Sequence, residues 1–227
     1  MPPVKIPQED HDRFFSLFNG KNTDAWKGWV TQNSDIWHIE DGAIVARGAS
    51  LRLQPSLKTE QFFSYFYTKK NTYEDFKLKL EARVNDGGIF GVCFRASHEI
   101  GQNPHCTNGY EVRINCSRKN VNITGTLLYT RGDRETVDDT IDELTVPAGK
   151  WFPLEITALG NNIIVAVDDD DVVSHFEPER RPSVGHIALH LLGAGTVAEF
   201  RSIEIKEYPR EPENKKKFGA KSRNKGG

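Results

Sequence analysis

The chain has 227 residues, of which 37% are hydrophobic and 10% aromatic, so it can build one large domain with a sizeable core. Its 30 basic and 32 acidic residues give a formal net charge of -2, and no overall field attracts nucleic acid or anionic membranes. No apolar run approaches the ~18 residues that a transmembrane helix needs, so we expect no membrane span.

The sequence predicts an N-terminal extension at 1–11, a single domain at 12–208 and a basic, flexible tail at 209–227. The tail is rich in Lys and Arg and lacks apolar periodicity, as solvated tails do. The N-terminus shows no apolar signal-peptide core. Two locations therefore stay open: the cytoplasm, or the periplasm or cell exterior if an export signal was removed. The oligomeric state also stays open.

Short strand-like runs separated by Gly, Asn, Asp and Pro recur along the chain, whereas helical patterns are scarce. The runs 35–40 and 43–46 predict a hairpin, because the intervening Asp41-Gly42 supplies the positive φ that a tight turn needs. In 72–84, apolar residues alternate with charged ones, which indicates one buried and one solvated sheet face. Further strands are expected at 89–95, 109–114, 122–129, 151–158, 163–167, 185–192 and 197–206, with a long loop at 130–146.

The last of these strands shows a break in its alternation. Phe200 is out of phase with Ile203 and Ile205, which predicts a β-bulge between them. Eight or more short strands without alternating helices indicate an all-β fold, a two-sheet antiparallel β-sandwich.

Polar residues interrupt the strands 89–95 and 109–114. Alternation places Arg95, Glu111 and Arg113 on the face opposite the large apolar residues, so we expect Arg95 and Glu111 side by side on neighbouring strands. Two interpretations are open. The pair is either an ordinary cross-strand ion pair or part of a sugar site, where Arg donates hydrogen bonds and Glu serves as acceptor, base or acid.

Histidines and tyrosines supply further candidates. His186 and His190 lie on one side of a strand but roughly 13 Å apart, which is too far to share a metal ion. We expect His190 to lie nearer the site. His105 falls in the connection between the two key strands, where site loops often carry function. Tyr65 and Tyr67 share a face and can line a sugar site.

No metal or cofactor motif is visible. Cys93, Cys106 and Cys116 form an odd set without a CxxC pair, which predicts free thiols rather than a zinc site or a disulfide framework. The acidic run 168–171 lacks EF-hand spacing and favours a solvated turn over a calcium site. Phosphate-binding loops, nucleophile elbows and the His-Glu-x-x-His motif are absent from the sequence. We therefore expect no cofactor and no metal.

A set of short motifs follows in order from residue 14 to 207: FFSLFNGK at 14–21, WHIEDG at 37–42, YEDFKL at 73–78, FRA at 94–96, GYEV at 109–112, GHIAL at 185–189 and FRSIEI at 200–205. This set resembles the 3-keto-disaccharide hydrolase domain family, a concanavalin A-like jelly roll. The resemblance implies two curved antiparallel sheets with a concave sugar-binding face.

The resemblance also implies hydrolysis or eliminative cleavage of glycosides already oxidised at C3. The C3 ketone acidifies the C2 proton, so a general base can remove it while the glycosidic oxygen leaves. On this view Glu111 is the base or acid, Arg95 orients hydroxyls or stabilises the enolate, and His190 is the third catalytic candidate. The substrate-binding candidates are Tyr65, Tyr67, Arg113 and His105.

One position departs from the family pattern. Family members commonly show Ile-Gly-Leu-Gln-x-His-Gly, whereas 187–193 reads IALHLLG, so His190 replaces the Gln and Leu192 the His. Three functions stay open: an enzyme that cleaves 3-keto-glycosides, a non-catalytic carbohydrate-binding (lectin-like) module, and an interaction module that uses the loops and the basic tail. A carbohydrate is the expected ligand in the first two.

Overall fold

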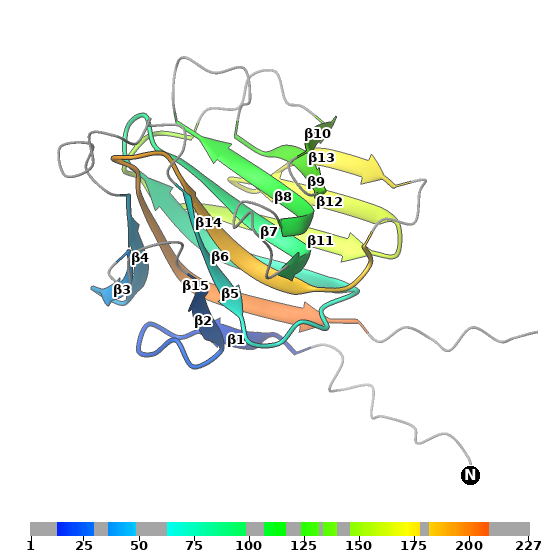
Figure 1. The fold of residues 1–227 in the computed structure, drawn as a ribbon, viewed down its shortest axis with the longest axis horizontal. Helices are drawn as coiled ribbons and strands as arrows, with labels where there is room; N and C mark the ends of the chain where they lie inside the picture. Colours follow the sequence, from blue (N-terminus) through cyan, green and yellow to red (C-terminus); the bar gives the residue numbers. More distant parts are fainter. Residues whose placement is uncertain are drawn as a thin grey trace, which may run out of the picture.

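The computed structural model describes residues 13–29, 36–48, 63–98, 107–116, 124–131, 134–139, 146–177 and 182–208. In these ranges the chain forms two antiparallel sheets packed face to face (Figure 1), which confirms the all-β, two-sheet sandwich expected from the sequence. None of the described residues forms a helix long and apolar enough to cross a membrane. The extension 1–11 and the tail 209–227 lie outside the described residues and stay predictions.

One sheet has eight strands. Its spatial order is β13 (Asp170–Phe176), β12 (Asn162–Val167), β11 (Phe152–Leu159), β6 (Phe76–Val84), β15 (Val197–Glu207), β4 (Ala43–Arg47) and β3 (Trp37–Glu40), with β1 (Phe15–Phe18) paired to β15. The predicted hairpin is present as β3 and β4, which pair antiparallel across the Asp41-Gly42 turn.

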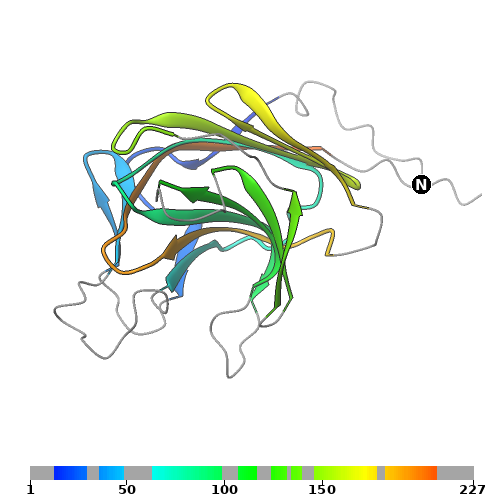
Figure 2. The same ribbon diagram turned by 90° about the horizontal axis from the view of Figure 1, so that it is seen from above.

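The other sheet has seven strands. Their order is β10 (Arg134–Asp139), β9 (Thr126–Arg131), β8 (Thr107–Asn115), β7 (Ile89–His98), β14 (His186–Leu192), β5 (Phe63–Thr68) and β2 (Trp26–Trp29). Figure 2 shows that this sheet curves away from the eight-stranded sheet. Its outward side is called the concave face below, and its other side packs on the core.

The core lies between the sheets and follows the period-two pattern of the strands. In β6 every second residue from Phe76 to Val84 is buried, and the charged residues between them are half-buried. Phe90 of the opposite sheet meets Phe200 of β15 edge to face, with ring centroids 5.0 Å apart. Burying each such aromatic side chain contributes about 1.5–3 kcal/mol to the free energy of folding.

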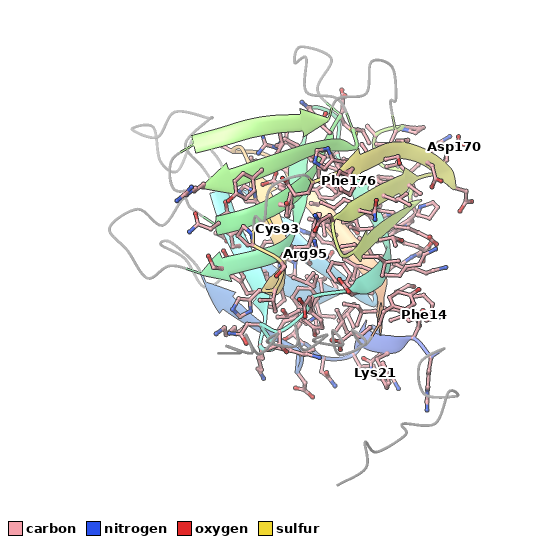
Figure 3. All side chains as sticks on the ribbon, turned by 90° about the vertical axis from the view of Figure 1, so that its right-hand side faces the viewer. Phe14, Lys21, Cys93, Arg95, Asp170 and Phe176 are labelled. Carbon is pink, nitrogen blue, oxygen red and sulfur yellow. The ribbon has the colours of Figure 1, made fainter. Side chains whose placement is uncertain are left out.

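Two expectations about the acidic segments need correction. The range 130–146 is not wholly a loop, because β10 pairs antiparallel with β9 inside it. Turn residues Asp168 and Asp169 lie as expected in an exposed turn with positive φ, but Asp170 already begins the edge strand β13 (Figure 3). Charged residues are common on edge strands, where they discourage pairing with other chains. The polarity of these segments was therefore not sufficient evidence for loops, because edge strands can be equally polar.

Register shifts interrupt several strand pairs, and two of them bear on the sequence predictions. The predicted bulge in β15 is confirmed, because the pairing register with β6 shifts between Arg201 and Glu204, and Ser202 between them has a φ of 51°. A second bulge, which the sequence did not reveal, lies in β7 near Arg95 and decides where that side chain points.

At this second bulge the register between β7 and β8 shifts between Phe94 and Ser97, and Arg95 adopts a left-handed φ of 47°. The extra residue reverses the alternation from this point on. Ala96 consequently lies on the concave face with Cys93, in the position that unbroken alternation would have given to Arg95.

Arg95 therefore does not form the expected pair with Glu111. Its side chain is 2% exposed, and its Nε donates to the Glu74 carbonyl at 2.9 Å while Nη2 donates to Asp75 Oδ1 at 3.3 Å. The same carboxylate oxygen accepts the Gly160 N–H, at 2.8 Å, from the turn between β11 and β12. Arg95 thus helps to fasten the seven-stranded sheet to the eight-stranded one.

Replacing this arginine tests a structural role. Arg95→Ala leaves the Asp75 carboxylate without its buried cation, so we expect the free energy of unfolding to fall by about 3 kcal/mol in urea denaturation. Arg47→Ala is the matched control, since Arg47 and Glu40 form an exposed pair, and it should change stability by less than about 1 kcal/mol. Equal stabilities of the two variants would contradict a fastening role for Arg95.

Candidate functional site

The concave face carries the polar candidates in two neighbouring rows across the sheet. One row runs Leu128, Glu111, Cys93, Ala188 and Tyr67, from β9 to β5. The next row runs Thr126, Arg113, Gly91, His190 and Tyr65. Glu111 and His190 are therefore diagonal neighbours rather than direct cross-strand partners.

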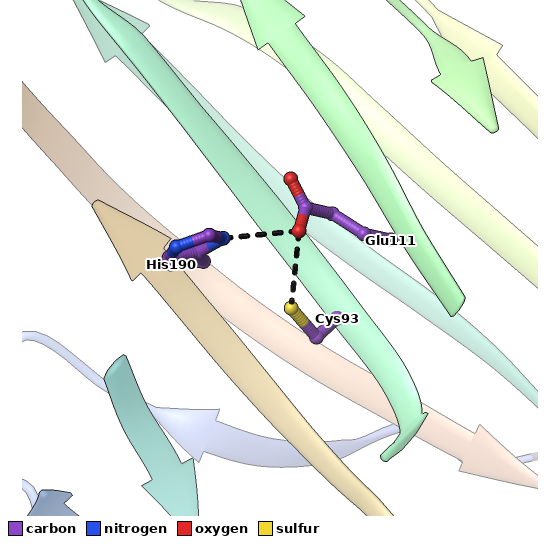
Figure 4. A group of neighbouring side chains, drawn as sticks. All are labelled: Cys93, Glu111 and His190. Atoms are coloured by element: carbon purple, nitrogen blue, oxygen red, sulfur yellow. Dashed lines mark hydrogen bonds and ion pairs between the residues drawn. The ribbon is translucent and has the colours of Figure 1, made fainter. Parts of the chain in front are cut away.

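The Glu111 carboxylate is the centre of the site (Figure 4). Its Oε1 accepts a hydrogen bond from Arg113 Nε at 2.9 Å, and its Oε2 accepts one from His190 Nδ1 at 3.0 Å. The Cys93 thiol also faces Oε2, at 3.9 Å. Glu111 is 2% exposed and His190 4% exposed. A buried carboxylate is thus held between a guanidinium and an imidazole, which satisfies its hydrogen-bonding capacity.

Gly91 makes this diagonal contact possible. A Cβ at position 91 would lie 2.4 Å from Glu111 Oε1 and 2.5 Å from its Cδ, so the carboxylate occupies the space where any other residue would place its side chain. A glycine inside a strand often marks such a close approach. The space left by the missing side chain of Gly91, called the glycine gap below, lets Glu111 contact Arg113 and His190 at the same time.

The surroundings of Glu111 keep it ionised. Burial by itself raises the pKa of this carboxyl, but the charges and hydrogen bonds of His190 and Arg113 outweigh burial and lower the pKa from 4.5 to about 2. At neutral pH the side chain is an acceptor and not an acid. Because its pKa lies so low, the group is also a weak base.

His190 uses one of its two ring nitrogens to hold the carboxylate. Its Nδ1 donates to Glu111, and its Nε2 is buried without a hydrogen-bond partner among the described residues. The ring stacks on Tyr65, with centroids 4.0 Å apart and planes at 13°, which fixes its orientation. In a neutral imidazole, donation from one ring nitrogen to a carboxylate leaves the lone pair on the other nitrogen, and this is the usual arrangement of a histidine base.

Two tyrosines extend the site along β5. Tyr65 and Tyr67 both lie on the concave face, as alternation predicted, with centroids 5.7 Å apart. Burial, followed by the nearby Cys93 and Glu111, raises the pKa of Tyr65 well above its usual value, so the phenol stays protonated. His186 is held separately: its Nδ1 donates to the carbonyls of Thr68 and Lys70 at 2.8 and 3.1 Å.

The structure thus brings together most, but not all, of the predicted residues. Glu111, His190, Arg113, Tyr65 and Tyr67 share the concave face. The bulge takes Arg95 out of this group, and Arg113 holds the carboxylate instead. His105 lies outside the described residues.

Two contributors were missed in the sequence. Gly91 carried a signal, since it interrupts an otherwise bulky strand. For Cys93 the only signal was its position in the alternating pattern of the strand. That position placed it on the correct face but did not indicate a contact with Glu111. Cys116 is a free thiol, as the sequence predicted, whereas Cys106 lies outside the described residues.

Two solved structures illustrate the fold that this chain shares with known proteins. A candidate glycosyl hydrolase from Parabacteroides distasonis aligns with a TM-score of 0.62 and 17% identity, over 90% of this chain and 98% of that one. The carbohydrate-binding module CBM66 from Bacillus subtilis aligns with a TM-score of 0.60 and 15% identity, over 86% of this chain and all of the module. Together they define the chain as a jelly-roll β-sandwich.

The family is shown by sequence as well. The chain belongs to the 3-keto-alpha-glucoside-1,2-lyase-like domain family, which it matches over residues 13–206. The comparison with curated proteins finds no match. This is the family that the ordered motifs of the sequence had indicated.

The first prediction from the site concerns the glycine gap. Gly91→Ala should displace the Glu111 carboxylate and break its bond to His190, at a cost of about 1–3 kcal/mol in stability. Nitrogen-15 NMR of the imidazoles measures this, because Nδ1 of His190 should lose its fixed proton. His186 is an internal control, since its Nδ1 contacts lie elsewhere and should not change. An unchanged His190 signal would contradict the role of Gly91.

The second prediction concerns acid stability. A carboxyl with a lowered pKa stabilises the fold above its unfolded value of 4.5 and loses that contribution as the pH falls toward 2. The difference between 4.5 and about 2, at 1.36 kcal/mol per pH unit, is about 3 kcal/mol. Urea unfolding of the wild type and Glu111→Gln should show their stability gap narrowing by most of this amount between about pH 6 and pH 2. Unfolding free energies of the two proteins that change in parallel over this pH range would refute the prediction.

Proposed function

We propose that this protein is an enzyme that cleaves 3-keto-glycosides on the concave face, with His190 as the general base. The observation that carries the proposal is the state of this one ring. Nδ1 is bonded to a buried, ionised carboxylate, while Nε2 is buried and has no hydrogen-bond partner in the described part of the chain. The family to which the chain belongs supports the choice of substrate.

The chemistry starts from a sugar that is already oxidised at C3. His190 Nε2 takes the C2 proton, which the neighbouring ketone acidifies, and the electron pair of the C2–H bond forms the enolate. The enolate then expels the aglycone oxygen from C1, and that oxygen takes up a proton, which the imidazolium can return. The products are an unsaturated 3-keto sugar and the free aglycone, and water adds to the sugar in a later step.

Each neighbour of His190 has a role in this scheme. Glu111 is not the base but the positioning anion, because it holds the proton on Nδ1 and stabilises the imidazolium that forms. Arg113 keeps Glu111 ionised and in place. Tyr65 orients the imidazole by stacking, and its protonated phenol is suited to donate a hydrogen bond to the substrate.

A carbohydrate-binding module without turnover is the second candidate. The observation in its favour is Leu192, a half-buried residue beside Ile89 at the place where family members commonly carry a histidine. Without that histidine, the face would retain tyrosines and polar groups for sugar recognition but lack a second proton-transfer group. The similarity to CBM66 is one of fold and leaves both candidates open.

Turnover of a 3-keto-sugar separates the two functions. The protein is incubated with 3-keto-trehalose and 3-keto-glucosides, and released glucose or keto-glucal is measured. His190→Asn is the informative variant, because its amide N–H can replace Nδ1 toward Glu111 while no atom replaces Nε2. We expect turnover to fall by about 10²–10⁴-fold, the usual contribution of a general base, with sugar binding retained.

The matched control is His186→Asn, which alters the other buried histidine of β14 and should preserve turnover within a few-fold. Wild-type turnover that survives unchanged in His190→Asn would remove His190 from the mechanism. Saturable sugar binding in calorimetry without any product from the wild type would instead establish the binding module.

A further inference from the structure

Three potential metal ligands meet on the concave face. They are Cys93 of β7, Glu111 of β8 and His190 of β14, which come from three adjacent strands. The Cys93 Sγ, a Glu111 carboxylate oxygen and a His190 ring nitrogen all lie within 4.8 Å of one another (Figure 4). All three residues are buried. The sequence did not indicate this cluster, because its members lie far apart along the chain.

The distances suit one small ion. A tetrahedral ion with bonds of about 2.0–2.3 Å holds its ligand atoms roughly 3.3–3.8 Å apart. Here Nδ1 and Oε2 are 3.0 Å apart, and Sγ and Oε2 are 3.9 Å apart. Side-chain shifts of less than about 1 Å would therefore bring the three atoms into the first coordination shell of one ion.

The donor types restrict which ion could bind. A thiolate is a soft ligand and an imidazole a borderline one, and together they favour Zn²⁺ or Co²⁺ over the hard ions Mg²⁺ and Ca²⁺. The thiolate and the carboxylate carry two negative charges, which neutralise a divalent cation in this buried place. Three ligands converge among the described residues, which leaves a fourth tetrahedral position for water or a sugar oxygen.

Neighbouring side chains orient these ligands as the outer shell of a metal site does. Arg113 holds Oε1 of Glu111, so that Oε2 faces both Nδ1 and Sγ. The stacked Tyr65 fixes the plane of the His190 ring. Such partners commonly fix ligand geometry in metalloproteins.

We propose that Cys93, Glu111 and His190 form a binding site for a divalent transition-metal ion. The metal site follows from its three ligands alone, but its effect on turnover rests on the proposed function. The ion takes the Nδ1 lone pair, so the proton on Nδ1 moves to Nε2, and the thiol releases its proton to solvent. Nε2 can then no longer accept a proton. His190 therefore cannot bind the ion and act as the general base at the same time, so the ion inhibits turnover.

Cobalt titration of the full-length, reduced protein tests the site without reference to activity. Co²⁺ should produce a near-ultraviolet thiolate-to-cobalt band and the visible bands of a tetrahedral ion, at one equivalent. Cys93→Ser should abolish the near-ultraviolet band, while the control Cys116→Ser should retain it, because the half-buried Cys116 thiol lies with Val146 instead. A band that is absent from the wild type, or that survives in Cys93→Ser, would overturn the proposal.

A second variant guards against a folding defect in Cys93→Ser. Glu111→Gln keeps the thiol but removes the carboxylate charge, so the cobalt band should persist with affinity reduced by at least 10-fold, a loss typical of disturbed metal sites. Unchanged affinity would remove Glu111 from the site. A cobalt band in a protein that turns over no 3-keto-sugar would support the metal site while refuting the proposed function. Turnover that Zn²⁺ leaves unaffected at saturating occupancy would refute the inhibitory consequence.

Discussion

The arrangement of the concave face depends on one buried carboxylate. Glu111 lies over the backbone of Gly91 and bonds Arg113 on one side and His190 on the other. Burial alone would favour the neutral acid, but two donors in a low-dielectric place reverse that preference. The ionised carboxylate then fixes the tautomer of His190, and the ring orientation is completed by Tyr65. The proposed base and the proposed metal site both follow from this contact.

The bulge in β7 has the second largest effect on the site, because it separates two arginines that looked equivalent. Arg113 stays on the concave face, while Arg95 is redirected to Asp75, where it joins the two sheets. The residue just before β14, Gly185, leaves room for the bulge. A Cβ at Gly185 would lie 2.5 Å from the backbone of Ala96, so only glycine fits at this approach.

The sequence predicted the features that depend on alternation within a strand. The alternating pattern of the sequence predicted the burial of β6, the shared face of Tyr65 and Tyr67, and the bulge after Phe200. The bulge at Arg95 was not visible, because polar or small residues follow it and no large apolar residue downstream reports the change. Strand β10 was missed for a related reason: the range 134–139 holds a single large apolar residue and shows no alternation.

By itself the sequence determined the all-β class, the sandwich, the family and the face on which Glu111 and Arg113 lie. A period of two is a local property, so one strand's residues suffice to assign its faces. Only the tertiary structure decided which of these side chains meet. Register shifts and the diagonal reach across Gly91 depend on neighbouring strands that are distant in the chain, and these placed Cys93 and His190 at Glu111 and withdrew Arg95 from it.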